Sequence, residues 1–157
     1  MRRVLIVCIN LKIGGGEKLA HEIVNFSIAR NITPTVLVPD AYNYEYYDDI
    51  FRKLGVKVIR VNIKNWYKLR NPLKLFNSLF WKFKLKLFSK RLYNSVHIIN
   101  LTLADRYYYD IPHPYRYFWD VVNAVQYNGS YFYSNRLLSQ VSDKVVFINL
   151  YQENEHR

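Results

Sequence analysis

The sequence predicts an α/β fold in which a mainly parallel sheet is covered by helices on both faces. Three observations lead to this prediction. Short apolar, β-branched runs alternate with segments of helical periodicity along the first half of the chain. A run of three glycines at residues 14–16 joins the first apolar run to the first helical segment. The length of 157 residues suits one domain with a substantial core and leaves no room for a second large domain. We therefore expect a single domain over residues 1–157.

The first strand and helix surround the glycines. RVLIVCI at residues 3–9 is continuously apolar, which is typical of a strand buried on both faces of a parallel sheet. EKLAHEIVNFSIAR at residues 17–30 has apolar side chains at helical spacing. Glu17 falls in the first turn, where the helix dipole favours an anion. The expected apolar face consists of Leu19, Ala20, Ile23, Val24 and Ile28.

The same order of elements then repeats. TVLVP at residues 35–39 predicts a strand, YEYYDDIFRKL at 44–54 predicts a helix closed by Gly55, and VKVIRV at 56–61 predicts a third strand. Alternation of this kind calls for right-handed crossovers between parallel strands. The first half of the chain is therefore expected to be Rossmann-like, with three layers.

A long helix is expected from Pro72 to about Leu92, because proline suits the first helical turn. One apolar stripe of this helix is expected to dock on the sheet. A second strip, bordered by lysines, lies away from it and needs another partner. The first stripe consists of Leu73, Phe76, Phe80, Phe83 and Leu87, and the second of Trp81, Leu85 and Phe88.

The remaining chain predicts further strands and one helix, separated by turn signals. In order, the expected elements are a strand at 95–101, a loop at 102–117, a strand at 117–125, a turn at Asn128-Gly129, a helix at 130–141 and a final strand at 144–150.

Composition limits the compartment and the kinds of site. Half of the residues are hydrophobic and 17% are aromatic, so the chain is expected to fold. Cys8 is the only cysteine, which excludes an internal disulfide or a cysteine metal cluster and suits the cytoplasm. No uncharged run reaches the roughly 18 residues of a membrane span. We expect a protein that is soluble or lies on a membrane surface.

The glycine run predicts an anion site, because free N–H groups and the positive end of the helix dipole meet between a strand and a helix. Phosphate is the usual ligand there. The dinucleotide fingerprint fits badly, since Leu19 replaces its third glycine, and Lys18 comes too soon for a P-loop. A tight turn without a ligand is the simpler alternative.

Two segments resemble retaining glycosyltransferases of the GT-B fold, family 4. IGGGEKLAHEIV after RVLIVCINL is similar to the family's Gly-Gly-x-Glu-Arg/Lys turn between the first strand and helix. SQVSDKVVFINLYQENE near the end resembles the segment that closes its N-terminal domain. The resemblance covers all 157 residues as one half of a two-domain enzyme, whose donor-binding C-terminal domain is absent.

The resemblance implies the positions of several functional residues. Gly14, Gly15 and Gly16, with Glu17 opening the helix, would approach the donor phosphate or the acceptor in the inter-domain cleft. The family's His-Asp pair corresponds to Trp119 and Asp120, so Asp120 is a weak catalytic candidate and no catalytic histidine is assigned.

A tyrosine-rich loop supplies candidates for acceptor binding. Aromatic rings and carboxylates suit sugars, and the loop follows the carboxyl end of a predicted strand. Packing of these side chains on the domain is at least as good an explanation. The four histidines lack metal-ligand spacing, so no metal site is expected. The loop candidates are Asp105, Tyr108, Asp110 and His113.

The net charge of +11 is concentrated in one segment. Nine basic residues and no acidic residue lie between Lys64 and Leu92. A solvated lysine face, an anionic membrane surface and nucleic acid are the three interpretations, with nucleic acid last because no motif for it is present. The membrane-surface candidates are Lys74, Trp81, Lys82, Lys84 and Phe88.

The sequence therefore predicts the acceptor-side half of a GT-B glycosyltransferase, cytoplasmic and peripheral at the inner face of the membrane. In the complete enzyme a UDP- or GDP-sugar would donate to a glycan or glycolipid acceptor without a metal cofactor. This chain alone is expected to be inactive unless a donor-domain segment or a second chain pairs with it. The alternatives are a non-catalytic basic module that binds membrane or nucleic acid, and another kind of nucleotide-binding α/β protein.

Overall fold

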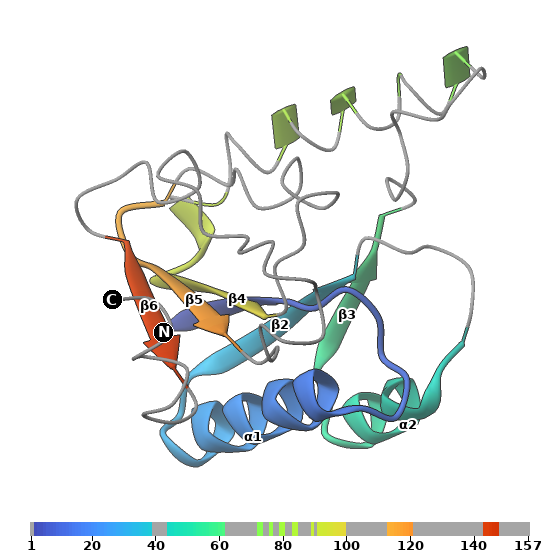
Figure 1. Ribbon diagram of the computed structural model, residues 1–157, viewed down its shortest axis with the longest axis vertical. Helices are drawn as coiled ribbons and strands as arrows, with labels where there is room; N and C mark the ends of the chain where they lie inside the picture. The colour runs from blue at the N-terminus through green and yellow to red at the C-terminus, as the bar shows by residue number, and fades with distance from the viewer. Residues whose placement is uncertain are drawn as a thin grey trace, which may run out of the picture.

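The described residues form a six-stranded sheet in which every neighbouring pair of strands is parallel (Figure 1). A computed structural model describes residues 2–38, 44–61, 72–73, 76, 79–80, 83–84, 89, 91–99, 113–120 and 143–147, with only the backbone at residue 120. The strand order is β3-β2-β1-β4-β5-β6. This order confirms the predicted parallel α/β architecture of Rossmann-like type.

The elements begin and end close to the predicted positions. Helix α1 is longer at its start than expected, because Gly15 and Gly16 are already helical. Strand β5 begins one residue earlier than expected, inside the segment predicted as loop. The elements are β1 Arg3–Val7, α1 Gly15–Ala29, β2 Thr33–Val38, α2 Tyr46–Lys53, β3 Lys57–Arg60, β4 Ser95–Ile99, β5 Arg116–Asp120 and β6 Lys144–Phe147.

The central strand is buried on both faces, as its continuous apolar run predicts. Val4 and Ile6 of β1 belong to the core that α1 and α2 form on one face of the sheet. Leu5 and Val7 alternate with them and are equally buried on the other face. From α1, Ala20 and Val24 enter the core, while Leu19 and Ile23 pack at its margin. The predicted apolar face is therefore correct except at its end, where Ile28 is 40% exposed.

Both described helices end in the same hydrogen-bonded cap at the amino-terminal edge of the sheet. Gly55 follows α2 with φ of 69°, and Asn31 follows α1 with φ of 56°. In α1, the N–H of Asn31 donates to Ile28 O at 3.0 Å and the N–H of Ile32 donates to Ser27 O at 2.9 Å. In α2, the N–H of Gly55 donates to Arg52 O at 3.0 Å and the N–H of Val56 donates to Phe51 O at 2.9 Å. This is the Schellman motif, which satisfies carbonyl groups that a helix end leaves free. The prediction that Gly55 closes the second helix is confirmed.

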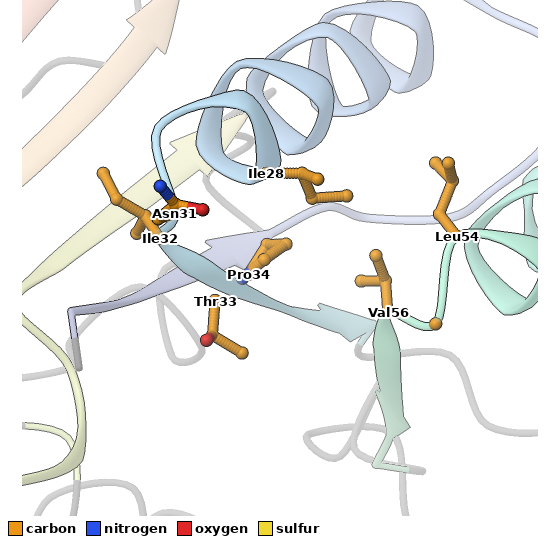
Figure 2. A pocket seen from close by; sticks show the side chains of 8 residues that line it. Ile28, Asn31, Ile32, Thr33, Pro34, Leu54 and Val56 are labelled. Atoms are coloured by element: carbon orange, nitrogen blue, oxygen red, sulfur yellow. The ribbon is translucent and has the colours of Figure 1, made fainter.

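A hollow of about 260 Å³ separates the ends of the two helices. Figure 2 shows the side chains of Ile28, Pro34, Leu54 and Val56 around it. The hollow lies beside the start of β2, so it is on the opposite edge of the sheet from the glycine turn, which follows the end of β1.

The segment from residue 72 to residue 92 is helical at every position that the structure describes. Its described parts lie on the other side of the sheet from α1 and α2 (Figure 1). The expectation that its first apolar stripe docks on the sheet is wrong for the four described members. Leu73, Phe76, Phe80 and Phe83 are 51–77% exposed.

An ion pair that is almost completely buried fastens β5 to the start of β6. The guanidinium of Arg116 donates from Nε to Asp143 Oδ1 at 2.7 Å and from Nη2 to Oδ2 at 2.5 Å. Their side chains are 1% and 2% exposed. Two parallel hydrogen bonds of this kind offset much of the free-energy cost of removing the two charges from water.

Candidate functional site

The glycine turn lies at the carboxyl-terminal edge of the sheet, where α/β proteins bind ligands. The N–H of Cys8 still donates to Leu37 O of β2 at 3.0 Å, after which the chain leaves the sheet and enters α1 at Gly15. Gly14 is the N-cap, and its carbonyl accepts the first helical hydrogen bond from the N–H of Lys18 at 3.0 Å. The strand-turn-helix arrangement predicted from the sequence is confirmed.

The loop before the glycines is held rigidly by the second helix. Leu11 is fully buried, and its N–H donates to Glu45 Oε2 at 2.6 Å. In return, its carbonyl accepts from the N–H of Tyr47, the second residue of α2, at 3.0 Å. Because these two bonds join the β1–α1 loop to the start of α2, the glycine turn is ordered before any ligand arrives.

The three glycines have different surroundings. Gly14 is extended, with φ of −170°, so its backbone does not require glycine. A Cβ there would instead collide with the Glu17 carboxylate. Gly15 is exposed, and a Cβ there would meet open space. Gly16 is buried. Glycine at residue 14 lets the end of the flexible Glu17 side chain approach closely, whereas nothing within the described domain requires glycine at residue 15.

Glu17 fills much of the position in which an anion was expected. Its side chain folds back from the first turn toward Gly14 and is buried, at 6% exposure. Its carboxylate accepts a hydrogen bond from its own N–H, which leaves the N–H groups of Gly15 and Gly16 without an acceptor among the described residues. Burial raises the pKa of Glu17, and the nearby Glu45 carboxylate raises this pKa further.

Acidic groups predominate around this turn. Arg60 at the end of β3 pairs with Asp48 at 2.5 Å and with Glu45 at 3.2 Å. Two carboxylates therefore share the Arg60 guanidinium, and the Glu17 carboxylate lies near one of them, Glu45. Burial and the Glu17 charge raise the pKa of the Cys8 thiol to about 12, so it stays protonated and is no nucleophile at neutral pH.

The other predicted site residues are not all brought to this edge. Asp120 is the last residue of β5 and so ends at the carboxyl edge, two strands from β1. His113 is buried and lies before the start of β5, at the opposite edge. Its Nε2 contacts Tyr93 O at 2.9 Å and its Nδ1 accepts from the backbone N–H of Tyr115 at 3.0 Å, which is a structural role. Asp105, Tyr108 and Asp110 lie outside the described residues.

One membrane-surface candidate can be placed. Lys84 is helical and exposed, and its Nζ lies 5.8 Å from the centre of the Phe80 ring. The other candidates, Lys74, Trp81, Lys82 and Phe88, lie outside the described residues. Within the part of the chain that the structure describes, no helix is long and apolar enough to cross a membrane. The same residues contain no group of three potential metal ligands.

Sequence reasoning missed the groups that hold the turn in place. A helix start at Glu45 with Asp48 three residues later is a capping pattern, and Asp48 Oδ2 does accept from the N–H of Glu45 at 2.8 Å. That pattern could have indicated the start of α2. The link from Glu45 to Leu11 spans 34 residues and left no local signal.

Comparison with solved structures identifies the type of fold. A crystal structure of Acinetobacter baumannii MurG, a GT-B glycosyltransferase, is similar to this chain with a TM-score of 0.50 and 14% sequence identity. The similarity covers 94% of this chain and 46% of the MurG chain, so the chain spans about half the length of that protein. No protein family model and no curated protein matches the sequence. The fold is therefore similar to one half of the GT-B fold, while glycosyltransferase activity and membership of family 4 stay predictions.

Proposed function

We propose that this chain is the acceptor-side, N-terminal half of a GT-B glycosyltransferase. The observation that carries the proposal is the six-stranded parallel sheet with its glycine turn after β1, in a domain similar to half of MurG. The complete enzyme would transfer a hexose from a UDP- or GDP-sugar to a glycan or glycolipid acceptor. Retention of the anomeric configuration follows only from the resemblance of the two end segments to family 4.

The glycine turn would serve the reaction by its position and its open surface. The N–H groups of the exposed Gly15 and the buried Gly16 are donors at the start of α1, after a loop that is held by Leu11 and Glu45. Donors fixed in advance stabilise developing charge without the cost of reorganisation. A diphosphate leaving group or an acceptor hydroxyl would both use them.

The carboxylate of Glu17 decides between these two uses. As a charged group it repels phosphate and attracts a hydroxyl donor, so the turn favours an acceptor hydroxyl while Glu17 is ionised. The raised pKa of Glu17 lowers the cost of protonating it, and the protonated acid would let a phosphate approach. Asp120 remains the candidate for a catalytic carboxylate, because its backbone position is at the same edge.

A nucleotide-sugar panel tests this proposal. The thermal stability of the purified chain would be measured with UDP, GDP, their sugars and NAD, for the wild type and for Gly15→Val. A ligand at a hundred times its dissociation constant adds about 2.7 kcal/mol to the native state. We expect a shift in Tm that Gly15→Val removes, because the valine side chain would enter the open space over the turn.

Ala29→Val is the matched control, since it places the same side chain at an exposed position at the other end of α1. A Tm shift that survives Gly15→Val would show that the turn does not bind the ligand. No shift with any nucleotide or sugar of the panel would contradict nucleotide binding at the glycine turn and would leave donor binding to another domain. A shift with NAD alone would favour the other kind of nucleotide-binding protein.

A second candidate function, attachment to an anionic membrane surface, is favoured by the helical segment 72–92. Phe76, Phe80 and Phe83 are more than half exposed, in a segment whose charges are all positive. Aromatic side chains among lysines are what an interfacial helix inserts, and each basic residue near an anionic surface adds about 1 kcal/mol. A peripheral location at the cytoplasmic face would bring the domain to a lipid-linked acceptor.

Pelleting with vesicles tests this second function. We expect the chain to sediment with phosphatidylglycerol vesicles at low salt and not with neutral phosphatidylcholine vesicles. Replacing Phe76, Phe80 and Phe83 with serine should abolish sedimentation. The control replaces three other exposed aromatic residues with serine, namely Phe26, Tyr46 and Tyr115. Equal loss in both triple variants, or equal binding to neutral vesicles, would contradict the proposed surface.

A further inference from the structure

A second, larger hollow lies at the amino-terminal edge of the sheet. It has a volume of about 440 Å³ and is enclosed by the start of β1, the start of β4 and the side of α1. Ile23, Phe26 and Ile32 form an apolar wall. Sites for small organic ligands are mostly apolar hollows of about 300 to 1,000 Å³ that contain a few polar groups. The proposed transferase chemistry does not use this hollow, because it lies at the opposite edge from the glycine turn.

The charged residues around the hollow have one sign. Arg2 and Arg3 line it, and none of its lining residues is acidic. The backbone here is fixed, because the N–H of Arg3 donates to Asn94 Oδ1 at 2.8 Å and the N–H of Asn94 donates to Arg3 O at 2.8 Å. The two strands β1 and β4 are thus joined at the rim, and the charge complements an anion.

A chain of hydrogen bonds leads from the interior of the sheet to the hollow. The indole N–H of Trp119 donates to His97 Nδ1 at 3.1 Å, so this nitrogen carries no proton. His97 Nε2 must then carry the proton of the neutral ring and donate it to Ser95 Oγ, 3.2 Å away. Burial lowers the pKa of His97 to about 4, which keeps the ring neutral at pH 7.

This arrangement fixes what Ser95 can offer. Its oxygen already accepts from His97, and no described residue accepts its hydroxyl hydrogen. Ser95 and His97 both line the hollow. The hydroxyl is therefore a donor that is free to turn toward a ligand, with polarisation along the chain adding to its strength. The rings behind it are held by stacking, since the His97 and Tyr117 centroids are 4.8 Å apart at 14°.

We propose that this hollow binds a small organic anion, an aryl or alkyl carboxylate, whose apolar body lies against Phe26 and Ile23 and whose carboxylate accepts from the Ser95 hydroxyl near Arg2 and Arg3. The apolar wall selects against inorganic phosphate, and the two guanidinium groups select against a cation. The site is independent of the glycine turn and of the function proposed for it.

The probe is 2-naphthoate, added to the full chain labelled with ¹⁵N. Binding would be followed through the indole N–H signal of Trp119, assigned with Trp119→Phe, and by calorimetry. We expect a saturable shift of that signal, because a ligand that accepts from Ser95 polarises the bond from Trp119 to His97. The amine 2-naphthylmethylammonium should bind at least tenfold more weakly.

Two variants address the two halves of the ligand. Ser95→Ala should weaken 2-naphthoate about tenfold, since a hydrogen bond to a charged group contributes at least this much. Phe26→Ala should also weaken it several-fold, whereas the control Tyr46→Ala should not. These two aromatic residues are 58% and 56% exposed, so neither variant threatens the fold.

The outcomes distinguish this site from the other features of the domain. Gly15→Val should leave 2-naphthoate binding unchanged, so failure of the transferase proposal would not affect this result. Shifts confined to the amides of Asn31 and Gly55 would place the probe in the smaller hollow of Figure 2 and overturn the inference. It would also be overturned by equal binding of the amine, by unchanged affinity in Ser95→Ala, or by no saturable binding at millimolar concentration.

Discussion

Replacing Glu17 by glutamine tests directly what the glycine turn can bind. The carboxylate is buried against Gly14 and beside the free N–H groups of Gly15 and Gly16. A phosphate held by these N–H groups would lie within a few ångströms of it. Two unit charges about 4 Å apart repel by about 1 kcal/mol in water and about 4 kcal/mol near a protein surface. Glu17→Gln removes this repulsion, so the variant should bind UDP at least about fivefold more tightly at pH 7.5.

The pH dependence of UDP affinity tests the same repulsion between phosphate and the Glu17 carboxylate. Since burial raises the pKa of Glu17, the wild type gains affinity for UDP as the pH falls and the carboxyl group takes up its proton. The variant cannot gain affinity in this way. Protonation of UDP itself affects both proteins equally, so only the ratio of the two affinities reports Glu17. Calorimetry from pH 5 to pH 8 should show that ratio approaching one at low pH.

The stability of the fold gives an independent reading. A carboxyl group with a raised pKa stabilises the native state below its ordinary pKa, and this contribution is lost as the pH rises through the folded value. Urea denaturation should therefore show that Glu17→Gln gains stability relative to the wild type as the pH increases, against a loss of dipole interaction of less than about 1 kcal/mol. If the wild type and Glu17→Gln bound UDP with equal affinity from pH 5 to pH 8, the placement of phosphate at the glycine turn would be refuted.

Three further predictions concern the described domain. Asp143→Ala should cost about 3–5 kcal/mol in urea denaturation, because it removes the carboxylate that faces the buried Arg116 guanidinium. The double variant Arg116→Met/Asp143→Leu should recover most of the loss, and a cost below about 1 kcal/mol for the single change would contradict this. Because φ is positive at residue 31, Asn31→Gly should be neutral or stabilising in thermal unfolding, and Asn31→Val should be destabilising by about 1 kcal/mol or more. Equal Tm values for the glycine and valine variants would be inconsistent with the cap. Burial lowers the pKa of His97 to about 4, so the stability that the neutral ring contributes is present above pH 6.5 and is lost as the pH falls toward 4, by up to about 3 kcal/mol. His97→Gln should remove this loss from the pH dependence of the free energy of unfolding.

The sequence was sufficient for the fold because the relevant signals are local. Apolar runs of strand length, an amphipathic stretch after the glycines and Gly55 at a helix end each report their own element. The predicted parallel sheet is confirmed, whereas its strand order, β3-β2-β1-β4-β5-β6, was not predicted from the sequence. Asn31 carried the same signal as Gly55 at the end of α1, but asparagine reports a left-handed cap less clearly than glycine does.

The contacts of the candidate site could not be predicted, because they join distant parts of the chain. Neither the bond from Glu45 to Leu11 nor the pairing of Arg116 with Asp143 leaves a pattern in either segment alone. The prediction that the first apolar stripe of the helical segment 72–92 docks on the sheet was wrong for a different reason. Helical spacing shows that apolar side chains share a face, but it does not show what covers that face, and Phe76 and Phe83 are exposed.

The glycine run could be placed from the sequence, but the different surroundings of its three residues could not. In the sequence its three members are equivalent, and any of them could be explained by a ligand. In the structure, Gly14 makes room for Glu17, Gly16 is buried and Gly15 faces open space. Of the three glycines, Gly15 is the one with neither a close contact nor burial, so a bound substrate is the explanation that we propose for glycine at this position. Glycine costs about 0.5–1 kcal/mol relative to alanine inside a helix and less at its first residue, so Gly15→Ala should leave the stability of the free domain unchanged or slightly raised. Any substrate that needs the open space over residue 15 should bind this variant more weakly.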